Sequence, residues 1–123
     1  LDVALIACIA ALKKAVLPGV TEQGNADYKH RTSTPLPLSD EIAPLSFCFY
    51  KLGKTLIMDP TREEEEAADN RVNFGISKWN GQYMINSSQK SGSAPLSASE
   101  IEYIASLLPK KYDELSEKLK KFL

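Results

Sequence analysis

The chain has 123 residues, which is enough for one domain with a modest core and too few for two independent domains. Hydrophobic residues make up 43% of the sequence and charged residues 25%, which is typical of an ordinary globular domain. The formal charge of −1 excludes a basic field over the whole protein, so a nucleic acid would have to bind a local patch.

The first segment, Leu1–Leu12, is rich in alanine and leucine and predicts a buried helix. This helix should end near Val16, because Pro18-Gly19 cannot continue it. The apolar run is shorter than the roughly 20 residues that span a bilayer. We therefore expect a core helix that belongs to a longer chain.

Cysteine and histidine chemistry has little support in the sequence. Cys8 and Cys48 lie in apolar stretches without a CxxC partner, so metal binding through them is not expected. We interpret both as reduced core residues, which fits an intracellular protein. His30 is the only histidine, which excludes a metal site built on several histidines.

The segment from Thr21 to Pro44 is polar and rich in turn-forming residues, and it predicts a loop or an edge strand. Within it, Lys29, His30 and Arg31 follow Tyr28. These side chains could contact a phosphate backbone and stack on a base, which makes them a candidate RNA contact. The same residues also suit an ordinary exposed loop, and both interpretations stay open.

Four strands are predicted in the middle of the chain, because apolar and polar residues alternate with the period of a sheet. A turn at Gly53 should join the first two, and Asn80-Gly81 should form a type I′ turn between the last two. The four predicted strands are Leu45–Tyr50, Leu56–Met58, Val72–Ser77 and Gln82–Asn86.

A long helix is predicted to follow, and it should begin at the capping box formed by Ser97 and Glu100. Pro109 should either kink this helix or open a second one. Its apolar side is expected to consist of Ile101, Ile104, Ala105, Leu108, Leu115, Leu119 and Phe122. After the first helix the order is therefore β-β-α-β-β-α, an α+β fold in which helices cover a four-stranded sheet.

Four consecutive glutamates, Glu63–Glu66, follow the apolar strand and Asp59. In a purely structural interpretation they form a short helix that Thr61 caps, with Glu64 completing the capping box. The acidic side chains would also complement the positive end of the helix dipole. Their functional interpretation is a divalent ion held by Asp59 and carboxylates one helical turn later. At most two of the glutamates could converge with Asp59, since adjacent residues on a helix point in different directions.

Four segments of the chain share one resemblance, and they are Leu1–Leu12, Leu17–Val20, Ile57–Thr61 with the glutamates after it, and Gln89–Ser93. Together they resemble the C-terminal half of ribonuclease PH-type ring subunits of the RNA exosome, and specifically the branch with an Asp-Pro-Thr sequence before its glutamates. The resemblance implies a ribonuclease PH domain 2-like fold for residues 17–123, and it assigns residues 1–16 to the terminal helix of a truncated upstream domain.

The resemblance also implies a place for catalysis. Active members of this family use inorganic phosphate to attack the terminal phosphodiester of RNA, with an acidic pair and a divalent ion. Their motif places the catalytic pair on Asp59 and Glu65 and the metal ligands on Asp59, Glu64 and Glu65. Here Glu65 stands where those members have aspartate, and its extra methylene would move a ligand by about an ångström, enough to degrade a catalytic geometry.

We therefore expect a structural, RNA-guiding ring subunit without strong catalytic activity and without a cofactor, which takes part in 3′-to-5′ RNA processing and degradation. Other ribonuclease PH-like exosome subunits and RNA are its expected partners, no membrane is expected, and the nucleus, nucleolus and cytoplasm are its expected locations. One alternative is an active phosphorolytic 3′-to-5′ exoribonuclease that uses Mg²⁺. A second alternative is an α+β interaction module unrelated to RNA.

Overall fold

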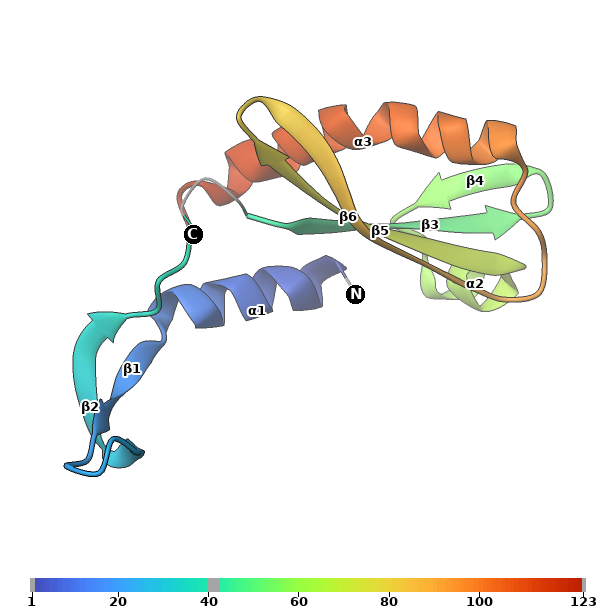
Figure 1. Cartoon of the computed structure of the whole chain (residues 1–123). Helices are drawn as coiled ribbons and strands as arrows, with labels where there is room; N and C mark the ends of the chain where they lie inside the picture. The colour runs from blue at the N-terminus through green and yellow to red at the C-terminus, as the bar shows by residue number, and fades with distance from the viewer. Residues whose placement is uncertain (1, 40–42, 123) are drawn as a thin grey trace.

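The computed structural model describes residues 2–39 and 43–122. Six strands form two separate antiparallel sheets, a four-stranded sheet in the order β4-β3-β5-β6 and a two-stranded hairpin of β1 and β2 (Figure 1). This is the predicted α+β order with one hairpin added. The elements are α1 (Asp2–Lys14), β1 (Val16–Val20), β2 (Ala26–Pro35), β3 (Leu45–Leu52), β4 (Thr55–Met58), α2 (Arg62–Ala67), β5 (Asn70–Trp79), β6 (Gln82–Ser91) and α3 (Ala98–Leu119).

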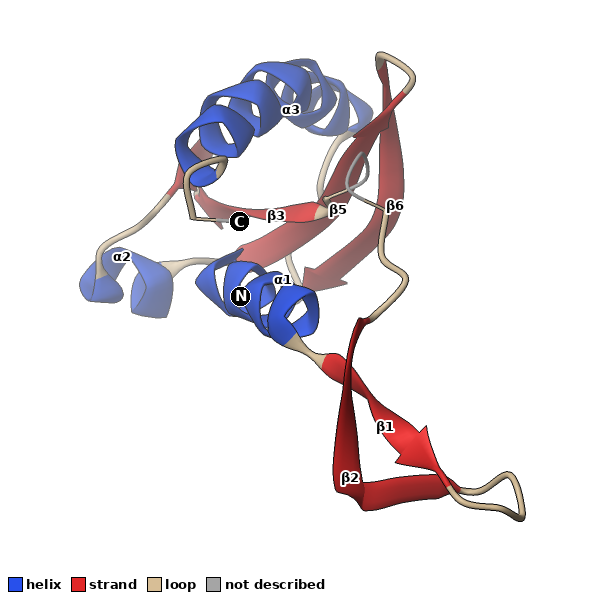
Figure 2. Cartoon of the chain, turned by 90° about the vertical axis from the view of Figure 1, so that its left-hand side faces the viewer, coloured by secondary structure: helices blue, strands red, loops and turns tan. Residues whose placement is uncertain are grey.

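Strand β3 is buried on both of its faces, because helices cover both sides of the four-stranded sheet. Helix α3 lies on one side, and α1 and α2 lie on the other (Figures 1 and 2). The apolar residues of β3 and β5 alternate with polar ones and meet α3. The resulting core consists of Leu45, Phe47, Phe49, Val72, Phe74, Ile76, Ile104, Leu108 and Tyr112.

Helix α3 begins at the predicted capping box, in which Ser97 and Glu100 each accept a hydrogen bond from the other residue's backbone N–H. It is one continuous helix through Pro109, so a second helix does not open there. The predicted apolar side is partly wrong, since Ile101 is 45% exposed, and Ala105 and Phe122 are exposed as well. The helix contacts mainly β3 and β5, so its apolar side chains that do not face these strands are left exposed.

Helix α1 ends at Lys14, two residues before the predicted end, and it is less buried than predicted. Only Ile9 is fully buried, whereas Cys8 is exposed and Val3 is 79% exposed. The interpretation of Cys8 as a core residue was therefore wrong, while Cys48 is buried and free as predicted. The helix is apolar on all sides, but only one side faces the sheet. Among the described residues, no helix is both long and apolar enough to cross a membrane.

Strands β1 and β2, residues 16–35, form an arm that extends away from the four-stranded sheet (Figure 2). The sequence predicted a loop or an edge strand from Thr21 to Pro44, because this segment is polar and rich in turn-forming residues. Both strands of a two-stranded hairpin are edges, so Pro18 and Pro35 can be accommodated. The turn is closed by hydrogen bonds between Thr21 and Asn25 and by Gly24 at a φ of +82°.

The two predicted hairpin turns of the main sheet are confirmed. Gly53 joins β3 to β4, and Asn80 and Gly81 have the positive φ values, 48° and 76°, of a type I′ turn. The last strand, β6, continues to Ser91, five residues beyond the predicted end at Asn86. It ends where Gly92 allows the chain to pass close to the carbonyl oxygen of Asp69.

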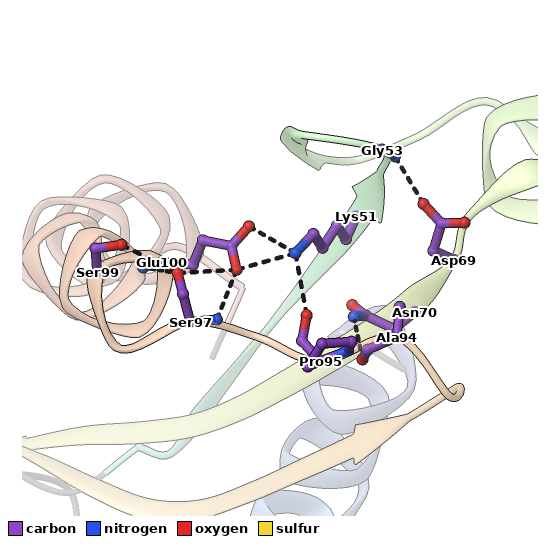
Figure 3. Close-up of polar contacts among 9 residues, drawn as sticks. All are labelled: Lys51, Gly53, Asp69, Asn70, Ala94, Pro95, Ser97, Ser99 and Glu100. Atoms are coloured by element: carbon purple, nitrogen blue, oxygen red, sulfur yellow. Dashed lines mark hydrogen bonds and ion pairs between the residues drawn. The ribbon is translucent and has the colours of Figure 1, made fainter.

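An ion pair connects the end of β3 to the start of α3 (Figure 3). Lys51 Nζ lies 2.8 Å from Glu100 Oε1 and donates a hydrogen bond of 3.0 Å to the carbonyl of Pro95. The two side chains are only 16% and 20% exposed. Lys51, followed by the backbone N–H of Ser97, holds the pKa of the Glu100 carboxyl below its ordinary value of 4.5. The loop before α3 is thereby held against the sheet.

Lys51→Met should lower the melting temperature at neutral pH and make it less sensitive to acid. The folded-state pKa of Glu100 is below its unfolded value, so the stabilisation from the pair is complete above the unfolded pKa and disappears as the pH falls through the folded pKa. We expect the difference in melting temperature between Lys51→Met and the unmodified protein to shrink as the pH is lowered from 7 to about 3. Lys118→Met, which changes an exposed lysine of α3, is the matched control, and a constant difference would contradict this role.

Gly92→Ala should destabilise the protein more than Gly81→Ala. Both glycines have left-handed backbones, with φ of +87° and +76°, so alanine is strained at either position by about 1–2 kcal/mol. A Cβ atom at Gly92 would also lie 2.6 Å from the carbonyl oxygen of Asp69, whereas at Gly81 it would meet open space. The free energy of unfolding in urea should fall by about 1–3 kcal/mol more for Gly92→Ala, and equal losses would contradict the close approach.

Candidate functional site

The predicted acidic site lies where β4 passes into α2. Asp59 has a positive φ of 53°, a conformation that aspartate tolerates better than most residues. Thr61 then caps α2, and its side chain accepts a 3.3 Å hydrogen bond from the backbone N–H of Glu64. Glu64 Oε2 accepts a 2.8 Å hydrogen bond from the backbone N–H of Thr61. The predicted capping box is confirmed, and it holds the Glu64 carboxylate beside Thr61 at the start of α2.

Glu65 contacts two side chains of the neighbouring strands. Its Oε1 atom accepts a 2.9 Å hydrogen bond from the Tyr50 hydroxyl and lies 4.0 Å from Arg71 Nη1. Tyr50 and Arg71 are cross-strand partners on β3 and β5. Burial, and then the hydrogen bond to Glu65, raises the pKa of the Tyr50 hydroxyl, so the phenol keeps its proton and continues to donate it. Glu65 therefore serves to connect α2 to the sheet.

Asp59 and Glu65 line the same small hollow of about 190 Å³, which we call the acidic hollow. Glu64 is not among the residues that line it. Asp59 and Glu65 were predicted from the sequence, whereas Asp2, which comes from the far end of the chain, was not. No local pattern indicates that the start of α1 reaches this place. The described residues that line it are Asp2, Val3, Cys48, Tyr50, Asp59, Pro60 and Glu65.

The Asp2 carboxylate binds the polar face of β3. It accepts hydrogen bonds from the Ser46 hydroxyl at 2.8 Å, and from the Cys48 backbone N–H at 3.0 Å and thiol at 3.1 Å. Asn73 Nδ2 donates to the same Ser46 oxygen and Cys48 sulfur. Burial, more than any other cause, raises the pKa of the Cys48 thiol, so it stays protonated at neutral pH. These groups fix α1 on the sheet, and none of them is arranged as a nucleophile.

The carboxylates near the acidic hollow do not converge as a metal site. Within residues 2–39 and 43–122, no three His, Cys, Asp or Glu side chains lie close enough together to hold an ion. Glu64 is bonded to Thr61 and Glu65 to Tyr50, which leaves Asp59 as the predicted ligand without such a bond. Asp59 and Glu65 thus line one hollow while Glu64 lies outside it, and both the metal site on Asp59, Glu64 and Glu65 and the acidic pair of Asp59 with Glu65 stay predictions.

The candidate RNA contact lies on the arm, far along the chain from the acidic hollow. Lys29, His30 and Arg31 are all exposed on β2. His30 Nδ1 lies 2.7 Å from Asp27 Oδ2, and this contact is the main cause that lowers the pKa of the Asp27 carboxyl. Arg31 instead lines a separate hollow together with Tyr28, and Lys29 and His30 do not. Of the three predicted RNA-contact residues, only Arg31 therefore lines this hollow, while Lys29 and His30 lie outside it.

Comparison with known proteins gives relatives with one shared name. "Exosome complex component Rrp42" of Pyrobaculum aerophilum is 36% identical over the whole chain, which covers 44% of that relative. The proteins of the same name in Thermococcus onnurineus and Methanothermobacter thermautotrophicus are 34% and 29% identical over 97% and 98% of the chain. In both cases the chain covers 43% of the relative, so it spans less than half of the length of these curated proteins.

A family profile described as "3′ exoribonuclease family, domain 2" matches residues 43–106, which is just over half of the chain. The matched part begins just before β3 and ends within α3, so it contains the whole four-stranded sheet and the acidic hollow's Asp59 and Glu65. The fold, the family profile and the relatives agree with the resemblance seen in the sequence. The chain therefore belongs to the 3′ exoribonuclease family, the ribonuclease PH type, and carries its domain 2.

Proposed function

We propose that the protein is a structural subunit of an exosome-type ring of ribonuclease PH-like chains, where it supports assembly and guides RNA. The observation that carries this proposal is the match over nearly the whole chain to several proteins named exosome complex component Rrp42. These relatives are more than twice as long as the chain, so the proposal concerns the protein of which this domain is a part.

The contacts of the acidic residues support a structural role. In active members of the family the positions of Asp59 and Glu65 would carry the acidic pair. Here Glu65 is already bound to Tyr50 and lies near Arg71, so turning toward Asp59 would leave the phenol without its acceptor. Glu64 is bound within its capping box. The glutamates thus stabilise α2 and its contact with the sheet.

Exposed apolar side chains support assembly with other chains. Val3 and Leu12 of α1 are exposed, and so are Leu17 and Val20 of the arm. A large apolar surface that is left exposed in one chain commonly marks a protein interface. A two-stranded hairpin is also marginally stable by itself, so the arm would be stabilised by contact with a further surface. Other ribonuclease PH-like subunits are the partners that we propose.

The finer parts of the proposal rest on the resemblance alone. They are a contribution to rRNA processing and to 3′-to-5′ degradation, and a location in the nucleus, nucleolus and cytoplasm. The named relatives are archaeal and do not bear on that location.

Affinity purification of the full-length tagged protein from its own cells, followed by mass spectrometry, tests the ring. We expect several other ribonuclease PH-like chains in comparable amounts at moderate salt, because buried apolar interfaces are little affected by screening. An unrelated protein with the same tag is the control. Recovery of the protein alone, or only as copies of itself, would contradict the proposal.

Asp59→Asn and Glu65→Gln should leave the rate of phosphorolysis by the purified assembly within about twofold of the unmodified rate. The reason is that neither side chain is proposed to take part in the chemical step, and a twofold change corresponds to only about 0.4 kcal/mol in the activation barrier. The measurement is phosphate-dependent release of nucleoside diphosphates from RNA. Glu63→Gln, an exposed glutamate of α2, is the matched control. A loss of more than about tenfold with Asp59→Asn alone, with the assembly intact, would show that this chain contributes a catalytic residue.

A further inference from the structure

A second hollow lies where the end of α1 meets the arm, and its volume is about 400 Å³. We call it the basic hollow. Its lining includes two cations and one aromatic ring, from Lys14, Arg31 and Tyr28. Three small apolar residues, Ala15, Val16 and Pro18, complete the described lining. The volume is within the range of ordinary small-ligand sites, which begins at roughly 300 Å³.

The backbone of the arm brings these residues together. Pro18 is the cross-strand partner of Arg31, and the register shifts on both sides of Pro18. Such irregularities increase the local twist of a hairpin and redirect its side chains. Thr32 Oγ1 donates a 2.8 Å hydrogen bond to the carbonyl of Leu17, next to the hollow. The strands of the arm are therefore held together beside the hollow by side-chain as well as backbone bonds.

Two further contacts fix the base of the arm. The backbone N–H of Leu36 donates a 3.3 Å hydrogen bond to the carbonyl of Ala15, directly after α1. Gly19 passes so close to β2 that a Cβ atom there would lie 2.9 Å from the carbonyl oxygen of His30. The relative position of Lys14 and Arg31 is thus set by the backbone.

The charges of the basic hollow favour an anion. Among the described residues, no carboxylate lines it and neither Lys14 nor Arg31 forms an ion pair. The nearby acidic residue of β2, Asp27, is already bound to His30 and to the backbone N–H of Lys29. The carbonyl end of α1 offsets part of the charge of Lys14, but Arg31 lies on the arm and has no such compensation.

The exposed ring of Tyr28 favours a ligand that also carries a flat ring. Tyr28 lies on β2, is 83% exposed and lines the hollow. An aromatic ring beside two cations is the combination with which proteins bind single-stranded nucleic acid, because bases stack on the ring while phosphates contact the cations.

We propose that the basic hollow binds single-stranded RNA, with one phosphate between Lys14 and Arg31 and the adjacent base stacked on Tyr28. The inference deepens the proposed RNA-guiding function and rests on it. It assigns the contact to Lys14, Tyr28 and Arg31, and it leaves Lys29 and His30 outside. It also places RNA at the joint between α1 and the arm, away from the acidic hollow.

The test is fluorescence anisotropy of a labelled ten-nucleotide oligouridylate titrated with the full-length protein. Arg31→Ala and Lys14→Ala should each weaken binding about fivefold to tenfold and reduce the salt dependence of log K by about 0.7, the amount expected for one lost phosphate contact. Tyr28→Ala should weaken binding about tenfold, whereas Tyr28→Phe should keep it, because stacking needs the ring and not the hydroxyl. The matched control is Lys54→Ala, which removes an exposed lysine at the β3–β4 turn.

The melting temperatures of all variants should match that of the unmodified protein, since the three side chains are exposed or line an open hollow. Equal loss with Lys54→Ala, or no loss with Arg31→Ala and Tyr28→Ala, would overturn the proposal. Loss of the other ribonuclease PH-like chains from the purified assembly, with RNA binding unchanged, would also overturn it and identify the basic hollow as a protein interface. An intact ring with unaffected RNA binding would reject this site alone and leave the proposed function standing.

Discussion

The whole fold depends on the burial of both faces of β3. One face supplies Leu45, Phe47 and Phe49 to the core under α3. The opposite face supplies Ser46, Cys48 and Tyr50, which are polar and must find hydrogen bonds when they are covered. The helices on that side satisfy this requirement with carboxylates, Asp2 of α1 and Glu65 of α2. The acidic residues near β3 are therefore explained by the polar pattern of the strand that they cover.

This constraint also fixes the side chains of two of the four glutamates that follow β4. A carboxylate that accepts a hydrogen bond from a partly buried phenol is held in place, and removing it leaves the donor unpaired. Glu65 is in that position, and Glu64 is held in its capping box. Asp59 faces the same hollow and has no such bond among the described residues. The contacts of Glu64 and Glu65 thus stabilise α2 and its position on the sheet.

The sequence predicted those parts of the fold that depend on local patterns. The alternation of apolar and polar residues predicted β3 and β5, and the two capping boxes predicted where α2 and α3 begin. Asn80-Gly81 predicted the turn between β5 and β6. Contacts between distant segments could not be read in this way, which is why the pairing of Asp2 with Ser46 was missed. The exposed Cys8 was missed because an apolar helix indicates burial but does not show what covers it. The arm was missed because β2 is polar and exposed along nearly its whole length, so its sequence lacks the alternation of apolar and polar residues that indicates a strand.

The central claim is that Glu65 serves the fold by binding Tyr50, and a double-mutant cycle tests it most directly. Tyr50→Phe, Glu65→Gln and the double variant are unfolded in urea, and their free energies of unfolding are compared. The account predicts a coupling of at least about 0.5 kcal/mol between the two side chains, with phosphorolysis by the assembly unchanged. Additive effects on stability, together with a loss of phosphorolysis in Glu65→Gln, would contradict it and assign Glu65 to the chemistry.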